Sequence, residues 1–165
     1  MKIAILGKIH PDGLEFLSSK NLEVLEINTF LENKLVNLIS DVEGIIIRTA
    51  KLNENILSHC DNLKIVARHG VGYDNIDLNY LNKKSIALAI TGQSNAVSVA
   101  EHVMTMMLTL SKNIFASDSL TRSNGFESKA ELPDFFELYQ KKILILGFGR
   151  IGQALAKRCL GFEME

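Results

Sequence analysis

Short apolar segments alternate with helix-like segments along the first half of the chain. The apolar segments are four to six residues long and rich in Ile, Leu and Val, which is typical of strands buried on both faces of a sheet. Between them, apolar residues recur at helical spacing, as in the series Leu31, Leu35, Leu38 and Ile39. This rhythm predicts a doubly wound α/β domain built on a parallel sheet. The predicted strands are residues 2–6, 22–27, 44–47, 63–67 and 85–90.

Local signals place helices between these strands. Pro11 follows His10 at the start of the first helix, where the missing amide hydrogen costs nothing. Residues 53–60 predict a short helix, and Asp77 can cap another that runs to about Lys83. Each of these helices is expected to connect two parallel strands.

The longest predicted helix covers residues 95–112. Its polar side chains form a narrow stripe, and apolar side chains, including several methionines, cover the rest. A helix so nearly apolar all round is expected inside a structure, between domains or subunits. The methionines are interpreted as core-filling side chains rather than ligands. The polar stripe consists of Ser98, Glu101, Thr105 and Thr109.

The segment that follows this helix lacks a regular pattern. Residues 113–140 show no sustained period and contain Asn124-Gly125 and Pro133. Because a connection of this length is unusual within one compact domain, it indicates a linker between two domains.

A glycine-rich motif follows the linker. Residues 143–146 read as a buried strand, Gly147, Gly149 and Gly152 have the spacing G-x-G-x-x-G, and residues 153–160 read as a helix. In this context the spacing is a dinucleotide-binding fingerprint, in which the glycines allow a tight turn, close approach to a diphosphate and close helix packing. An ordinary strand–helix turn is the alternative. The acidic residue that binds the adenosine ribose would be expected about 20 residues further on, beyond Glu165.

Composition narrows the possible partners. With a hydrophobic content of 47% and a net charge of −1, the chain is expected to be globular and to lack a basic surface for nucleic acid. No apolar stretch approaches the ~20 residues needed to span a bilayer. Cys60 and Cys159 are expected to be buried free thiols in a cytoplasmic protein. The histidines do not pair at metal-ligand spacing, so no metal is assigned.

The candidate chemistry lies where predicted strands end, because ligands of open parallel sheets bind beyond the carboxyl ends of the strands. Arg48 follows the third strand, and Arg68 begins the glycine-rich loop that follows the fourth. Two arginines with open amides nearby would form an anion site. The alternative is that both arginines are solvated and the glycines only serve a turn. His69 is expected to be a hydrogen-bonded loop residue, and His102 a packed helix residue.

Three motifs in order resemble those of the D-isomer-specific 2-hydroxyacid dehydrogenases, especially the phosphoglycerate dehydrogenase branch. They are residues 65–77 (IVARHGVGYDNID), residues 95–102 (NAVSVAEH) and residues 142–152 (KILILGFGRIG). The resemblance implies a flavodoxin-like substrate-binding domain over residues 1–94, an interdomain helix and linker over 95–140, and the first βα unit of a Rossmann NAD-binding domain over 141–165.

The resemblance also implies roles for individual residues. The substrate's acid or phosphate groups would face Arg48, Arg68, Asn95 and the backbone of Gly70, Val71 and Gly72. The cofactor, NAD, would bind at Gly147, Phe148, Gly149, Arg150, Ile151 and Gly152.

The same resemblance implies that catalysis is incomplete. Family members carry an Arg, a Glu and a His later in the nucleotide domain, and those positions lie beyond Glu165. The chain is therefore expected to be the N-terminal half of a dehydrogenase, with no catalytic residue assigned, no turnover by itself and weak NAD binding at best.

Two other functions occur on folds of this kind. A non-catalytic binding or interaction protein on the same fold is the alternative. A signalling receiver is rejected, because Lys8, His10 and Arg48 stand where receivers need acidic residues. The partners expected are a small hydroxy acid, keto acid or phosphate anion and a second copy of the chain. A homodimer with exchanged C-terminal segments would bury the apolar tail and the long helix.

Overall fold

A computed structural model describes residues 1–92, 94–123 and 134–165. The described chain forms two compact units, residues 1–92 and residues 93–165. Each has its own hydrophobic cluster.

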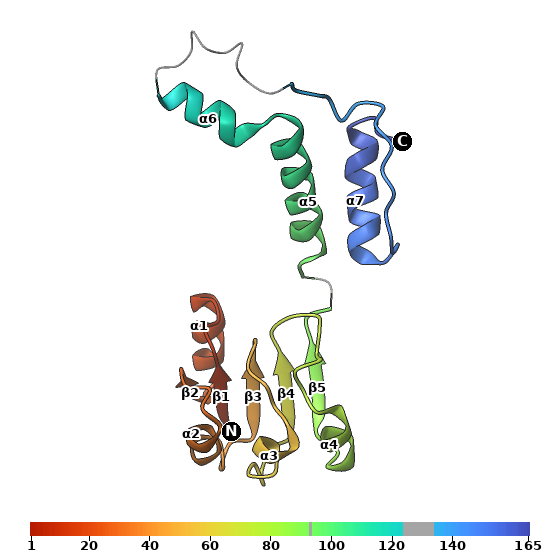
Figure 1. The fold of residues 1–165 in the computed structure, drawn as a ribbon. Helices are drawn as coiled ribbons and strands as arrows, with labels where there is room; N and C mark the ends of the chain where they lie inside the picture. Colours follow the sequence, from red (N-terminus) through yellow and green to blue (C-terminus); the bar gives the residue numbers. More distant parts are fainter. Residues whose placement is uncertain (93, 124–133) are drawn as a thin grey trace. The chain divides into compact units, whose positions relative to one another are not determined.

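The first unit is built on a parallel sheet of five strands (Figure 1). The strand order is β2-β1-β3-β4-β5, so β2 lies on one side of β1, and β3, β4 and β5 follow on the other side. The predicted doubly wound α/β fold is therefore confirmed, and the predicted strands differ from the observed ones by at most two residues at either end. The strands are β1 Lys2–Leu6, β2 Glu23–Ile27, β3 Gly44–Ile47, β4 Ile65–Arg68 and β5 Ala87–Ile90.

Four helices connect these strands: α1 Pro11–Ser19, α2 Glu32–Leu38, α3 Glu54–Leu57 and α4 Leu78–Lys83. Side chains from α2, α3 and α4 pack with one face of the sheet in a single buried cluster, whereas α1 adds no residue to it. The expected cap of α4 is confirmed, because the Asp77 carboxylate accepts from the Tyr80 amide at 3.0 Å. Asn53 caps α3 in the same way, through the amide of Ile56.

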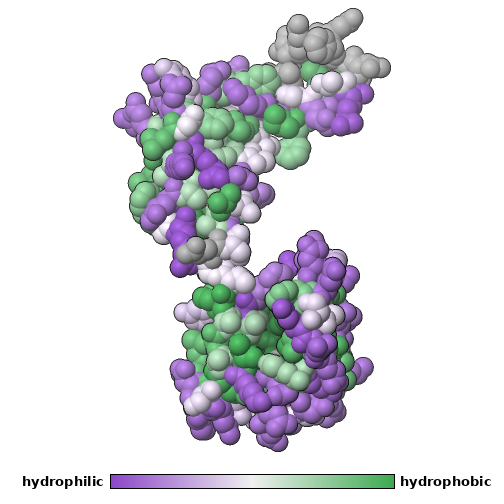
Figure 2. Space-filling model, turned by 180° about the vertical axis from the view of Figure 1, so that it is seen from behind, coloured by the Kyte–Doolittle hydropathy of each residue, from purple (hydrophilic) through white to green (hydrophobic). Residues whose placement is uncertain are grey.

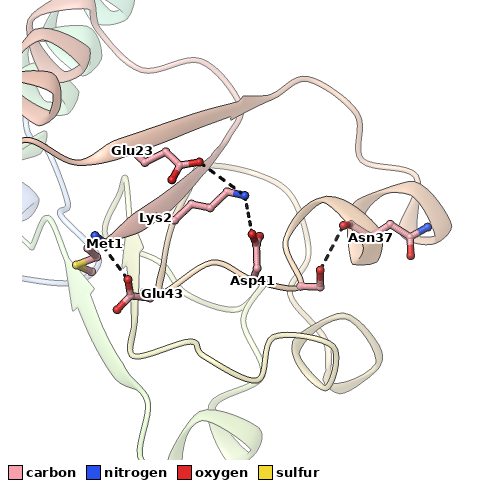
Figure 3. Close-up of polar contacts among 7 residues, drawn as sticks. Met1, Lys2, Glu23, Asn37, Asp41 and Glu43 are labelled. Atoms are coloured by element: carbon pink, nitrogen blue, oxygen red, sulfur yellow. Dashed lines mark hydrogen bonds and ion pairs between the residues drawn. The ribbon is translucent and has the colours of Figure 1, made fainter.

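Ion pairs join the amino-terminal edge of this sheet (Figure 3). Lys2 of β1 lies 2.7 Å from Asp41 and 3.8 Å from Glu23, which joins β1 to β2 and to the turn before β3. Glu43 pairs with Lys64 and with the terminal amine of Met1. These contacts join the starts of β1 and β2 to the residues that precede β3 and β4, at the edge opposite the one where ligands of such sheets bind.

The second unit contains the helices α5 Ala96–Ser111, α6 Ile114–Arg122 and α7 Arg150–Gly161. Helices α5 and α7 lie side by side (Figure 1) and share a buried cluster, in which the Cys159 thiol donates to the Met104 sulfur at 3.9 Å. Met104 therefore fills a core, as predicted. Helix α6 was not predicted, because its sequence offers no sustained apolar period.

The buried strand predicted at residues 143–146 is not observed in the described part of the chain. Its beginning does pair with the chain terminus, since the Ile143 amide donates to the Glu165 carbonyl at 2.8 Å and the Glu165 amide donates to Lys141 at 3.0 Å. Beyond Ile143, no described strand lies beside the segment, and Leu144 and Leu146 are 82% and 88% exposed. The prediction was wrong because a strand must pair its backbone hydrogen bonds with a neighbouring strand, and no described strand is available to this segment.

Apolar side chains also reach the surface of both units (Figure 2). The prediction that α5 is covered all round holds only for the face toward α7, because Val97, Met106 and Leu110 are exposed. Among the helices in the described ranges, none is long and apolar enough to cross a membrane.

Candidate functional site

The two arginines singled out from the sequence stand on neighbouring strand ends. Arg68 is the last residue of β4 and pairs in register with Ile47, so Arg48 follows directly on the adjacent strand. The amide of His69 continues the pairing by donating to the Ile47 carbonyl at 2.8 Å. The structure thus places Arg48 and the start of the loop after Arg68 at one carboxyl edge, as the parallel sheet requires.

The Arg68 side chain folds back over its own loop. Its guanidinium donates to the carbonyl of His69, and its Nε is buried with no hydrogen-bond partner among the described residues. Gly70 lies directly beneath, at φ +149°, where a Cβ would overlap the guanidinium. The backbone conformation therefore favours glycine at position 70, and any larger residue would also displace the flexible end of the Arg68 side chain.

The tip of this loop carries free donors. The Gly70 amide donates within the loop, to the Arg68 carbonyl, whereas the amides of Val71 and Gly72 have no partner in the described part of the chain. Unpaired backbone amides beside an arginine form the kind of concave, electropositive surface that binds carboxylate or phosphate.

The rest of the loop is fastened to the segment after β3. Leu52 and Ile76 form a parallel bridge, in which the Leu52 amide donates to Asn75 at 2.8 Å and the Asp77 amide donates to Leu52 at 2.9 Å. The Asn75 side chain adds a hydrogen bond to the Ala50 carbonyl. The loops that follow β3 and β4 are therefore one hydrogen-bonded structure.

A cavity of about 410 Å³ lies on the other side of Arg48, at the ends of β1, β2 and β3. No site role is predicted for Lys8, Asn28 or Thr49 in its wall from the ends of the third, fourth and fifth strands alone. Lys8 and Asn28 follow β1 and β2 as Arg48 follows β3, so the same reasoning would have found them. The cavity is lined by Gly7, Lys8, Asn28, Phe30, Arg48 and Thr49.

His69 lies in the loop, as expected, and its backbone is hydrogen-bonded, but its ring is not, and the expectation that His102 is packed was wrong. His69 is exposed and its ring makes no hydrogen bond within the described ranges, while His102 is exposed on α5 rather than packed. The described residues contain no group of three or more His, Cys, Asp or Glu side chains that could hold a metal ion.

The remaining candidates belong to the second unit. Asn95 precedes α5 as its N-cap residue, and its exposed side chain makes no cap hydrogen bond there. Gly149 is the N-cap of α7, so the amides of the first turn of a twelve-residue helix follow the motif directly.

The glycines of the motif have distinct geometric roles. Gly147 has φ +94°, which favours glycine, and a Cβ on Gly149 would meet nothing within 4 Å. A Cβ on Gly152 would overlap the Gly147 carbonyl, so the third glycine lets α7 begin close against the preceding segment. Phe148 and Ile151 are exposed between them.

Comparison with known proteins gives a consistent result. The sequence model described as "D-isomer specific 2-hydroxyacid dehydrogenase, catalytic domain" matches residues 3–156. The D-3-phosphoglycerate dehydrogenase of Archaeoglobus fulgidus is 31% identical over 167 residues, which cover 100% of this chain and 31% of that protein.

Solved structures extend the likeness to three dimensions. An NADPH-dependent glyoxylate/hydroxypyruvate reductase from Sinorhizobium meliloti superposes with a TM-score of 0.87 at 26% identity, covering 99% of this chain and 52% of the other. A D-lactate dehydrogenase from Aquifex aeolicus, solved with NAD and lactic acid, has a TM-score of 0.84 at 28% identity, covering 99% and 49%. The chain spans about a third to a half of the length of the curated relatives that it matches.

Proposed function

The chain belongs to the D-isomer specific 2-hydroxyacid dehydrogenase family, and from this we propose that it binds a D-2-hydroxy acid, or the corresponding 2-keto acid, for hydride exchange with NAD. The observation that carries the proposal is the carboxyl edge of the first unit's sheet. There Arg48 and Arg68 stand on adjacent strands beside the unpaired amides of Val71 and Gly72. These groups bind the substrate's carboxylate, and the family resemblance also assigns Asn95 to the substrate.

The motif from Gly147 to Gly152 fits the diphosphate of the cofactor. Gly149 leaves open space above the backbone, and Gly152 permits the close start of α7, whose first-turn amides and dipole favour negative charge. Phe148, Arg150 and Ile151 stand in the same turn. The bound nicotinamide supplies the hydride donor or acceptor.

The chain's own residues act on the substrate by binding and orientation. Charge-assisted hydrogen bonds from an arginine and two amides fix the carboxylate, and a fixed carboxylate sets the position of the neighbouring carbon that exchanges hydride. We assign roles to residues 1–94 as the substrate-binding domain, to 95–140 as the interdomain helix and linker, and to 141–165 as the first βα unit of the nucleotide domain.

Residues 1–165 are proposed to bind without turning substrate over. General acid–base catalysis needs a positioned group at the substrate hydroxyl, and the ring of neither exposed histidine, His69 or His102, makes a hydrogen bond among the described residues. We also propose that residues 1–165 alone bind NAD weakly. NADH oxidation with a panel of 2-keto acids checks this, and a rate that His69→Ala or His102→Ala abolishes would contradict it.

A homodimer is proposed as the assembled state. Leu144, Leu146 and Phe148 are exposed near the chain's end, and burial of each such side chain is worth roughly 1.5–3 kcal/mol. Exchange of this segment between two copies would provide the ladder neighbour that the segment lacks. Light scattering at micromolar concentration tests the mass, and a monomer with the segment protected from hydrogen exchange would contradict the proposal.

The two free thiols support a cytoplasmic location.

Titration of the chain with D-lactate, followed by amide NMR, tests the proposed substrate site. We expect shifts at residues 68–72, and Arg48→Gln should weaken binding about tenfold, since one charge-assisted hydrogen bond is lost. Lys83→Gln removes the same charge from the opposite edge of the sheet and should leave binding unchanged. Equal effects of the two variants, or shifts outside this edge, would overturn the proposal.

A further inference from the structure

The side chain of Gln153, one turn into α7, is hydrogen-bonded to the turn that precedes its own helix. Its Nε2 donates to the Phe148 carbonyl at 3.0 Å. We propose that Gln153 is a positioning residue for the cofactor site: it holds the peptide group between Phe148 and Gly149 so that the Gly149 amide faces the diphosphate. This inference rests on the proposed function, because it takes the turn at Gly147–Gly152 as the diphosphate site.

A carbonyl that is held in place also fixes the amide of the next residue. All described peptide bonds are trans, and in a trans peptide the C=O and N–H bonds point in opposite directions from one planar group. Gln153 holds the Phe148 carbonyl on its own side of the turn. The Gly149 amide therefore points away from the Gln153 side chain, and it has no partner in the described part of the chain.

The preceding peptide group is oriented in the same sense by a different contact. A Cβ on Gly152 would overlap the Gly147 carbonyl, so that carbonyl lies against the start of α7. The Phe148 amide, on the same peptide group, points the opposite way and likewise has no partner within the described ranges. Two successive amides that face away from the helix form an anion-binding concavity.

These two peptide groups differ in how easily they could turn over. Turning over the first would require a positive φ at Phe148, which a residue with a side chain disfavours. Turning over the second changes the sign of φ only at Gly149, and glycine accepts either sign. Gly149 has φ −76°, and a Cβ there would meet nothing within 4 Å, so packing does not enforce this conformation. The hydrogen bond from Gln153 supplies the restraint that the backbone lacks.

The exposure of Gln153 separates a positioning role from a structural one. Because the side chain is exposed, water can replace its hydrogen bond, and its loss should change the stability of α7 little. The effect falls instead on the direction of one amide. Only a positioning role predicts that a single amide of the turn loses its response to the cofactor.

Proton NMR of the full chain tests the restraint without any ligand. The NOE between Hα of Phe148 and the amide hydrogen of residue 149 depends on how this peptide group is turned. It should change in Gln153→Met, which keeps the length and helix propensity of the side chain but loses the donor. Adding Gly149→Ala to Gln153→Met should restore the original NOE, because alanine disfavours a positive φ. The same NOE in the original chain and in Gln153→Met would overturn the inference.

Titration with NADH provides the second test, read from the amide shifts of the full chain. In the original chain we expect shifts at Phe148, Gly149 and Ile151. Gln153→Met should remove most of the shift at Gly149 and keep the other two. It should also weaken NADH binding about threefold to tenfold, because one amide hydrogen bond is largely lost. Gln140→Met, the control, deletes another exposed glutamine donor of the second unit and should change binding less than twofold.

The results distinguish this inference from the proposed function. Equal loss of all three shifts in Gln153→Met, or equal weakening by Gln140→Met, would overturn the positioning role. If NADH shifts none of these amides in the original chain while the NOE still changes in Gln153→Met, the proposed cofactor site fails and the hold of Gln153 on the peptide group stands.

Discussion

Arg158 of α7 donates through Nη2 to Oε1 of Glu101 on α5 at 2.8 Å, and this pair joins the two helices of the second unit. The guanidinium is also oriented from its own helix, because Nη1 donates to the Ala154 carbonyl at 2.9 Å. Glu101 belongs to the polar stripe of α5 that the sequence revealed. That stripe therefore includes a side chain that binds a neighbouring helix.

A double-mutant cycle measures this ion pair. Glu101→Gln, Arg158→Met and the double variant should give a coupling free energy of roughly 0.5 kcal/mol in urea unfolding, because Glu101 is exposed and water screens the pair. The coupling should shrink in 1 M salt, where charges are screened. Coupling that is unaffected by salt would show that packing, rather than charge, joins the two side chains.

The motif glycines allow a matched comparison within one helix. Gly152→Ala should destabilise the second unit by about 1–3 kcal/mol, because the added Cβ overlaps the Gly147 carbonyl. Gly161→Ala, at the other end of α7, meets nothing within 4 Å and should be neutral or slightly stabilising. Thermal unfolding compares the two, and equal effects would contradict the assigned close approach.

Acid should weaken the amino-terminal edge of the sheet. A hydrogen bond from Lys64 lowers the pKa of Glu43, and one from Lys2 lowers the pKa of Asp41. A lowered folded-state pKa gives stability that is present above the unfolded value, about 4, and lost as pH falls through the folded value. Glu43→Gln should therefore flatten the acid limb of a stability–pH profile, and an unchanged limb would exclude Glu43 as a cause.

The same edge responds in the opposite sense to base. The Asp41 hydrogen bond raises the pKa of Lys2 above 10.5. Its stabilising effect is complete below that unfolded value and is lost as pH rises through the folded one. Lys2→Gln should remove this part of the alkaline loss, measured by unfolding between pH 9 and 12.

Both thiols should resist modification until the chain unfolds. Burial, helped by the charge of Asp61, raises the pKa of Cys60 to about 11, and burial also raises the pKa of Cys159. The thiolate is the reactive form, so a disulfide reagent at pH 8 should label neither cysteine quickly. Labelling in urea provides the control, and rapid labelling of the native chain would show that one cluster opens locally.

The strands of the first unit could be predicted from the sequence, because each is a short apolar run whose local pattern indicates a buried strand. The segment 143–146 has the same kind of pattern and forms no strand, because a ladder also needs a distant neighbour. Arg48 and Arg68 could be found because each adjoins an unmistakable strand. That Lys8 stands beside Arg48 depends on β1 lying between β2 and β3, which the sequence assigned only through family resemblance. Nor does any local pattern show that Arg68 turns back onto His69.

The bridge between Leu52 and Ile76 has a consequence for how this edge can vary. The spacing between the segments that follow β3 and β4 is set by backbone hydrogen bonds at Leu52 and Asp77, not by the side chains that face a ligand. Residues such as Thr49 and Val71 can therefore be exchanged without moving the walls on which they stand. A scaffold of this kind can acquire a new ligand preference by single substitutions, while the distance between the two loops at its binding edge stays the same.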